Sequence, residues 1–224
     1  MLALVAAVVG VALVLAGLAP RTSPPGPGSS VEQEGDTKPA PRPSTPQAHQ
    51  RDKRDKTAGV ADLVTGPLLP SAVPVSIGIP RLHVFSRLED LGVDQDGVMD
   101  VPAEPASAGW YELGPSPGAL GPAVVAGHVT WNQVPAVFFR LAELRPGDVV
   151  QVTRADDLVA VFEVTRVEVY PKTAFPTDLV FGAIDHAGLR LITCGGDYEQ
   201  GAHRYSDNVV AFARLTGWHP SQQQ

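Results

Sequence analysis

The apolar residues of this 224-residue chain are distributed unevenly, and the first cluster lies at the N-terminus. Residues 2–19 form one apolar run without a charged side chain. At about 1.5 Å per residue, a helix of that length spans about 27 Å, close to the thickness of the hydrocarbon layer. We therefore expect residues 1–20 to be a transmembrane anchor or a signal segment. The run exceeds the about 7–15 apolar residues of most signal peptides, which favours a retained anchor over a cleaved signal.

The apolar pattern disappears over residues 21–74. This stretch is rich in Pro, Ser, Gln and charged residues, and it includes the run RDKRDK at Arg51–Lys56. Such a composition cannot bury enough apolar surface to offset the entropy of ordering the chain. The sequence therefore predicts a disordered linker over residues 21–74, which acts as a tether about 40 Å or more in reach.

A third pattern, of short β-branched runs bounded by Gly, Pro or Asp, fills residues 75–218 and predicts an all-β domain. A single short helix is expected around Pro135–Leu144, where Phe138, Phe139, Leu141 and Leu144 fall on roughly one side. Many short strands with little helix are typical of a barrel or a sandwich. Residues 219–224 are expected to be a tail. The predicted strands are Val75–Ile79, Ala123–Ala126, Asp148–Thr153, Val159–Tyr170, Leu189–Thr193 and Asn208–Leu215.

Charge and cysteine content exclude several classes of function and site. The formal net charge is −7, and from Val75 onward ten Lys or Arg residues face eighteen Asp or Glu residues. A domain this acidic repels the phosphate backbone, which excludes nucleic-acid binding. The chain has 1 cysteine, Cys194, which excludes an intramolecular disulfide and a multi-cysteine zinc site.

Three residues are candidates for catalysis. Cys194 ends the run LRLITC and precedes Gly195-Gly196, where a substrate backbone can approach the sulfur closely. His128 follows the apolar run AVVAG, and a reactive thiol needs such a base or cation nearby. Arg204 lies ten residues beyond Cys194, within reach of the same site if the two strands are neighbours. The alternative reading is structural: a packed thiol, a structural histidine and a solvated arginine.

Together these pieces resemble the sortases, and most closely the actinobacterial class F group. The resemblance spans about residues 77–213 in family order, and the pairing of AGHV with LITC is its most specific part. It implies a closed β-barrel with one or two short helices, with Cys194 as nucleophile, His128 as the family histidine and Arg204 as the arginine. Asn208 or a backbone amide is the alternative oxyanion donor. The matching segments are GWYELGPSPGALGPAVVAGHV, PAVFFRLAELRPGDVVQVTR, YPKTAFPTDLVFG, LRLITCGGDYE and YSDNVVAFA.

The resemblance also implies an activity and a location. A sortase is a cysteine transpeptidase that cleaves an LPxTG-like sorting signal through a thioester and transfers the protein to a cell-wall amine. Its partners would be substrate proteins with C-terminal sorting signals, an amine acceptor and the membrane. No cofactor is expected, and no dense carboxylate cluster indicates a metal. The protein would be a single-pass cell-membrane protein with an extracytoplasmic catalytic domain. The alternatives are a cell-wall cysteine peptidase or amidase, and a non-catalytic tethered β-barrel binding module.

Overall fold

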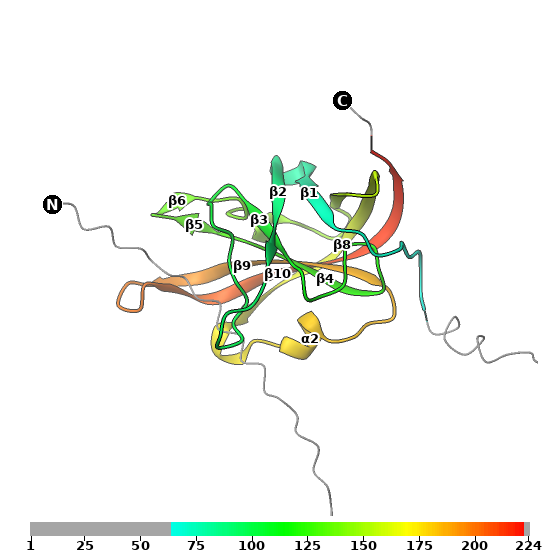
Figure 1. Ribbon diagram of the computed structural model, residues 1–224. Coiled ribbons are helices and arrows are strands. Elements are labelled where there is room, and N and C mark those ends of the chain that lie inside the picture. Colours follow the sequence, from blue (N-terminus) through cyan, green and yellow to red (C-terminus); the bar gives the residue numbers. More distant parts are fainter. Residues whose placement is uncertain (1–63, 222–224) are drawn as a thin grey trace, which may run out of the picture.

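Eight strands close into a barrel in the computed structural model, which describes residues 64–221 (Figure 1). The prediction of an all-β barrel is confirmed, and each of the six predicted strands lies largely within an observed one. In order around the barrel, the strands are β1 (Pro74–Ile79), β2 (Val84–Leu91), β3 (Ala108–Tyr111), β4 (Gly121–Gly127), β9 (Ala187–Glu199), β10 (Arg204–Pro220), β8 (Leu158–Pro171) and β7 (Val149–Arg154).

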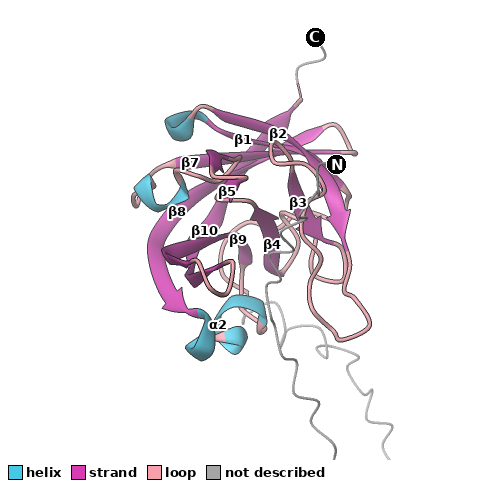
Figure 2. Cartoon of the chain, turned by 90° about the vertical axis from the view of Figure 1, so that its left-hand side faces the viewer, coloured by secondary structure: helices cyan, strands magenta, loops and turns pink. Residues whose placement is uncertain are grey.

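Short elements decorate the barrel. Strands β5 (Thr130–Trp131) and β6 (Val134–Pro135) form a separate two-stranded sheet, and α2 (Thr177–Phe181) is the one α-helix of residues 64–221. Figure 2 shows α2 outside the barrel wall. The remaining helical turns are the 3-10 segments η1 (Pro80–Leu82), η2 (Leu141–Glu143) and η3 (Lys172–Ala174).

The pairing of β4 with β9 is parallel, and it determines where the site forms. Its register runs from Gly121 opposite Ala187 to Ala126 opposite Ile192. Parallel neighbours end at the same edge of a sheet, about 4.8 Å apart. The residues that follow the two strands are therefore brought together, although more than sixty residues separate them in the sequence.

The barrel wall separates two apolar layers. Alternate side chains of β9, such as Leu189 and Leu191, fill the barrel interior. Ile192, whose side chain points to the opposite face of β9, joins a second cluster with Val210 of β10 and Val180 of α2 on the outer face. Both faces of these central strands are buried, which explains why their sequences read as continuous apolar runs.

The helix predicted over Pro135–Leu144 is reduced to the three residues of η2. Phe138, Leu141 and Leu144 are buried as their spacing predicts, whereas Phe139 is 48% exposed. The Phe138 N–H donates to the carbonyl of His128 at 2.9 Å. This bond ties the segment to the end of β4, and the N–H groups of Phe139 and Leu141 donate three residues back, to Ala136 and Phe138, so the segment folds as tight turns and not as a regular α-helix.

The expected anchor, residues 1–20, and residues 21–63 of the expected linker lie outside the described residues. Within residues 64–221, no helix is both long and apolar enough to cross a membrane. Residues 64–73 lie against the barrel: Leu69 is 7% exposed, and its N–H donates to the carbonyl of Gly118 at 2.8 Å. At the other end, β10 extends to Pro220 and so includes the first two residues of the expected tail.

Candidate active site

Cys194 and His128 meet at the end of the β4–β9 pair. Each follows the last paired residue of its strand, Ile192 or Ala126, by two positions, so both lie at the same level on the outer face. The Thr193 hydroxyl donates to the carbonyl of Gly127 at 2.8 Å and holds the two strand ends together. The structure therefore brings together the two residues that the sequence selected as nucleophile and base.

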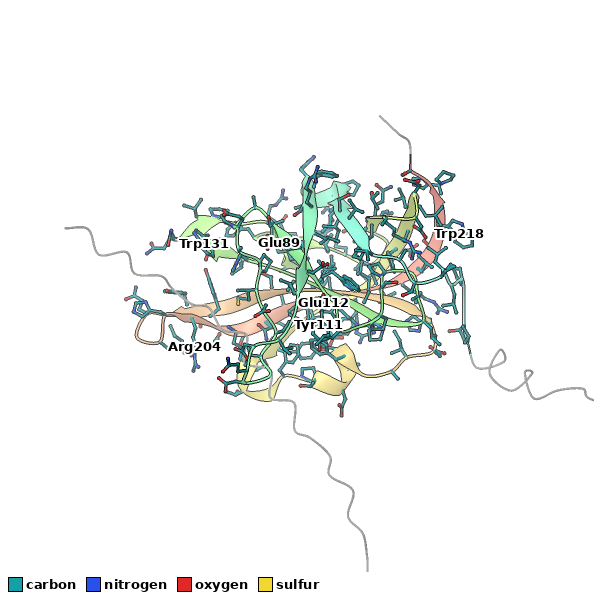
Figure 3. All side chains as sticks on the ribbon, in the orientation of Figure 1. Glu89, Tyr111, Glu112, Trp131, Arg204 and Trp218 are labelled. Atoms are coloured by element: carbon teal, nitrogen blue, oxygen red, sulfur yellow. The ribbon has the colours of Figure 1, made fainter. Side chains whose placement is uncertain are left out.

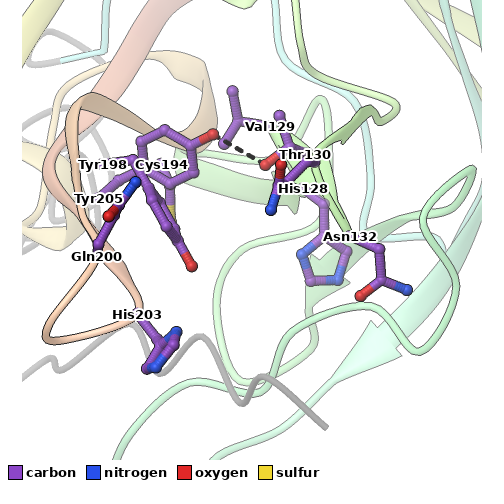
Figure 4. Close-up of a pocket in the computed structure, with 10 residues that line it drawn as sticks. His128, Val129, Thr130, Asn132, Cys194, Tyr198, Gln200, His203 and Tyr205 are labelled. Atoms are coloured by element: carbon purple, nitrogen blue, oxygen red, sulfur yellow. Dashed lines mark hydrogen bonds between the residues drawn. The ribbon is translucent and has the colours of Figure 1, made fainter. Parts of the chain in front are cut away.

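The two side chains line one cavity of about 670 Å³ (Figure 4). The end of β4 and the β5–β6 sheet form one side, and the β9–β10 hairpin contributes Tyr198 and Tyr205 to the other. The Tyr205 and Thr130 hydroxyls are hydrogen-bonded at 2.9 Å, which bridges the two sides. Cys194 and His128 are each 8% exposed, so the chemistry is confined to the wall of this cavity.

The thiol of Cys194 is subject to two opposing influences. Burial raises its pKa, because a thiolate is poorly stabilised away from water. The ammonium of Lys172, at the start of η3, lies 3.5 Å from Sγ and opposes this effect by lowering the pKa. Sequence reasoning missed Lys172. The signal that could have identified it is that Lys172 is the one lysine in the sequence after Lys56.

His128 is held in one tautomer by its surroundings. Its Nε2 lies 2.8 Å from the carbonyl of Pro102, and since a carbonyl only accepts, Nε2 must carry a proton. In the neutral ring, Nδ1 is then the atom that can take up and release a proton. The Trp131 ring packs edge-on against the imidazole, with 4.9 Å between centroids, and restricts its rotation.

Arg204 lies away from the cavity. It begins β10 at the exposed hairpin, its side chain is 58% exposed, and its Nε donates to the Glu199 carboxylate at 3.2 Å (Figure 3). The neighbouring Tyr205 lines the cavity instead, and successive side chains of a strand point to opposite faces. The structure thus brings Cys194 and His128 together but leaves Arg204 outside.

Asn208 is closer to the nucleophile than Arg204. It is the cross-strand partner of Cys194 in the β9–β10 ladder, and it is 3% exposed. Its Oδ1 accepts no hydrogen bond from any of residues 64–221. A buried amide oxygen without a donor is costly, and such atoms often mark functional sites.

The arrangement supplies a nucleophile, a proton carrier and a cation. A thiol beside an imidazole and an ammonium is suited to acyl transfer. Residues 64–221 contain no group of three or more His, Cys, Asp or Glu side chains placed to hold a metal ion.

Comparison with known proteins agrees with this chemistry. The family model described as the sortase domain matches residues 77–216, and no curated protein matches the chain. Solved structures share the fold at low identity. Sortase A of Listeria monocytogenes has a TM-score of 0.52 at 19% identity and covers 69% of this chain and 93% of its own. The SrtA sortase of Actinomyces oris has 0.50 at 19%, covering 69% and 86%. Sortase C-3 of Streptococcus pneumoniae has 0.50 at 15%, covering 69% and 68%.

Proposed function

The chain belongs to the sortase family of cysteine transpeptidases, and from this we propose that Cys194 is its nucleophile and His128 its proton-transfer partner. One observation carries the assignment. The chain has 1 cysteine, and its sulfur shares a cavity wall with a histidine whose Nδ1 is free to exchange a proton. Sortases act on proteins that carry sorting signals, and this cavity is where we place the signal peptide.

Acyl transfer begins with loss of the thiol proton from Cys194 to Nδ1 of His128. The thiolate attacks the carbonyl carbon of the scissile amide, an S–C bond forms, and the carbonyl electrons move to oxygen. As the tetrahedral species collapses, the C–N bond breaks and the imidazolium returns its proton to the departing amine. A thioester remains on Cys194.

The second half of the reaction releases the acyl group. A free amine attacks the thioester carbon, its surplus proton passes to Nδ1 of His128, and the C–S bond breaks. The imidazolium then returns this proton to Sγ of Cys194, which regenerates the enzyme. Water competes with the amine for the same thioester, so slow hydrolysis accompanies transfer. The products are a new amide and the resting thiol.

Substrate and location follow from the family resemblance. We place the chain in the class F group on the segments quoted above, with an LPxTG-like signal cleaved between Thr and Gly. The acceptor is the amine of a cell-wall precursor, and residues 1–20 anchor the enzyme in the cell membrane with its catalytic domain extracytoplasmic. Arg204 can bind substrate or oxyanion in this scheme only when its pair with Glu199 opens.

The test uses the full chain, a fluorogenic LPxTG-type peptide and an amine acceptor, with products identified by mass. We expect an amine-linked product from the wild type and none from Cys194→Ala or His128→Ala. Hydrolysed peptide alone would indicate a cysteine peptidase. Absence of turnover over a range of peptides, together with a thiol unreactive to small alkylators, would favour the non-catalytic binding module.

A further inference from the structure

We propose that Lys172, rather than Arg204, is the catalytic cation of this site and holds the negative charge of the Cys194 sulfur. The inference rests on the proposed function and names a residue that the sequence motifs did not select. The contact that carries it is the 3.5 Å separation between Nζ of Lys172 and Sγ of Cys194, the reacting atom.

The strand register explains why this lysine reaches the sulfur. Tyr170 of β8, Asn208 of β10 and Cys194 of β9 are cross-strand partners in one row. Lys172 follows Tyr170 by two positions, where β8 gives way to η3, so its side chain belongs to the same face. The long, flexible stem of lysine then carries the ammonium back over the end of the neighbouring strands to the sulfur.

Within the part of the chain that the structure describes, no carboxylate neutralises the charge of Lys172. Among residues 64–221, no carboxylate lies within ion-pair distance of its ammonium, and the sulfur is its one side-chain partner. Arg204, by contrast, is paired with Glu199 and 58% exposed. An unpaired, half-buried cation exerts a stronger field on its neighbour than an exposed and paired one.

The ammonium acts at two points in the first half of the reaction, formation of the thiolate and attack on the carbonyl. It opposes the burial that disfavours the thiolate, and so increases the fraction of nucleophile at neutral pH. When the sulfur attacks, the negative charge moves from Sγ to the carbonyl oxygen two bonds away. The three N–H donors of an ammonium on four rotatable bonds can follow that charge.

Alkylation of Cys194 by iodoacetamide tests this pairing without any peptide substrate. Because Cys194 is the only cysteine, the rate in the full chain reports on this thiol alone. We expect Lys172→Met to slow alkylation about tenfold at pH 7 and to leave the rate at high pH, where the thiol is fully ionised, unchanged. Lys172→Arg keeps the charge and should restore most of the rate.

Other charged and titratable groups near the sulfur could also affect how the alkylation rate depends on pH. They are His128 just after β4, Tyr198, His203 and Tyr205 from the hairpin, and Asp207 of β10 next to Gly196. Arg81→Met, which removes an exposed cation on η1, is the control and should leave the profile unchanged. A profile that moves in His128→Ala or Arg204→Met but not in Lys172→Met would overturn the proposal.

Turnover is measured separately so that the two proposals can fail independently. Lys172→Met should lower kcat/KM for transpeptidation by about 10–100-fold, and Arg204→Met by less than about threefold. If Lys172→Met changes the pH profile of alkylation but the wild type forms no amine-linked product, the interaction between Lys172 and Cys194 is supported and the transpeptidase activity is rejected. Normal turnover in Lys172→Met would reject Lys172 as a catalytic residue.

Discussion

At the scale of single residues, the site depends on which atom of each side chain remains free. The carbonyl of Pro102 binds Nε2 of His128, and this leaves Nδ1 to exchange protons with the thiol and the leaving amine. Lys172 contacts the sulfur from η3, the segment that follows β8. The imidazole thus needs only to carry a proton, because the fixed charge beside the thiolate is supplied separately.

Because His128 transfers the proton and Lys172 supplies the positive charge, the effect of His128→Ala should depend on the leaving group of the substrate. With a peptide substrate, kcat should fall about 10²–10⁴-fold, because the departing amine receives no proton. With a thioester substrate, whose thiolate leaves without protonation, the loss should be much smaller. The two rates are compared under single-turnover conditions. Equal losses for both substrates would show that His128 acts in attack or binding and not in departure of the amine.

At the scale of elements, the β9–β10 hairpin carries the nucleophile at its base and one side of the cavity along its arms. Gly196 lies just beyond Cys194 with φ +73°, a conformation that favours glycine. A Cβ there would overlap the carboxylate of Asp207 and the hydroxyl of Ser206. The hydroxyl of Ser206 accepts a hydrogen bond from the N–H of Asp197 at 3.1 Å. The added methyl group would therefore disturb this hydrogen bond between β9 and β10.

Gly196→Ala should therefore lower the free energy of unfolding by about 1–3 kcal/mol and reduce turnover, since the strain falls beside the nucleophile. Gly201→Ala, at the tip of the same hairpin, is the control, because no atom lies within 4 Å of its added Cβ. Chemical denaturation and peptide turnover are measured for both variants. Similar behaviour of the two would mean that the hairpin tolerates strain at its base.

The sequence predicted the central strands well but did not reveal how they are paired. Short runs bounded by Gly, Pro and Asp were enough to place β4 and β9, and with them His128 and Cys194. The parallel register between these strands depends on the closure of the whole barrel, which no local pattern encodes. Lys172 was missed for the same reason: it reaches the sulfur from η3, across a row of three strands.

Arg204 shows the opposite difficulty. Its spacing from Cys194 placed it in the right strand, but the face on which a side chain lies depends on register, and a shift of one residue reverses it. The β9–β10 ladder has such an irregularity between Tyr205 and Asp207. Sequence distance from the cysteine therefore cannot decide which residue of this hairpin faces the cavity.

At the scale of the whole molecule, the segment before β1 is part of the folded unit. Arg154 is 1% exposed and donates to the carbonyls of Pro117 at 2.5 Å and of Pro70 at 2.6 Å. Together with the buried Leu69, these bonds fasten residues 64–73 to the barrel. A chain that begins at Val75 lacks both the buried leucine and one acceptor of the guanidinium.

We expect a chain that begins at Val75 to be less stable than one that begins at Val64 by about 3–5 kcal/mol, from the lost burial of leucine and the unsatisfied arginine donor. Thermal unfolding of the two chains measures the difference. Leu69→Ala in the longer chain should reproduce part of the loss. Equal melting temperatures would show that residues 64–73 contribute no stability.

The ion pair of Arg154 also makes stability depend on pH. Arg154 donates to both carboxylate oxygens of Asp156, at 3.1 and 2.6 Å, and these hydrogen bonds lower the pKa of Asp156. A carboxyl whose pKa is lower in the folded state contributes its stability in full above its unfolded pKa, about 3.9. This contribution is lost as the pH falls through the lower, folded pKa.

Asp156→Asn should therefore be less stable than the wild type at pH 7, by about 1–2 kcal/mol, since the Asp156 side chain is 33% exposed and the pair is partly screened. The difference should narrow below about pH 4 and close in stronger acid, where the wild-type carboxyl is protonated too. Asp157→Asn is the control, because it removes the same charge from the same turn and no cation pairs with Asp157 within residues 64–221. Denaturation midpoints from pH 2 to pH 8 give the comparison. A gap that is constant with pH would mean that Asp156 contributes by shape and packing, and that the charge of Arg154 is balanced elsewhere.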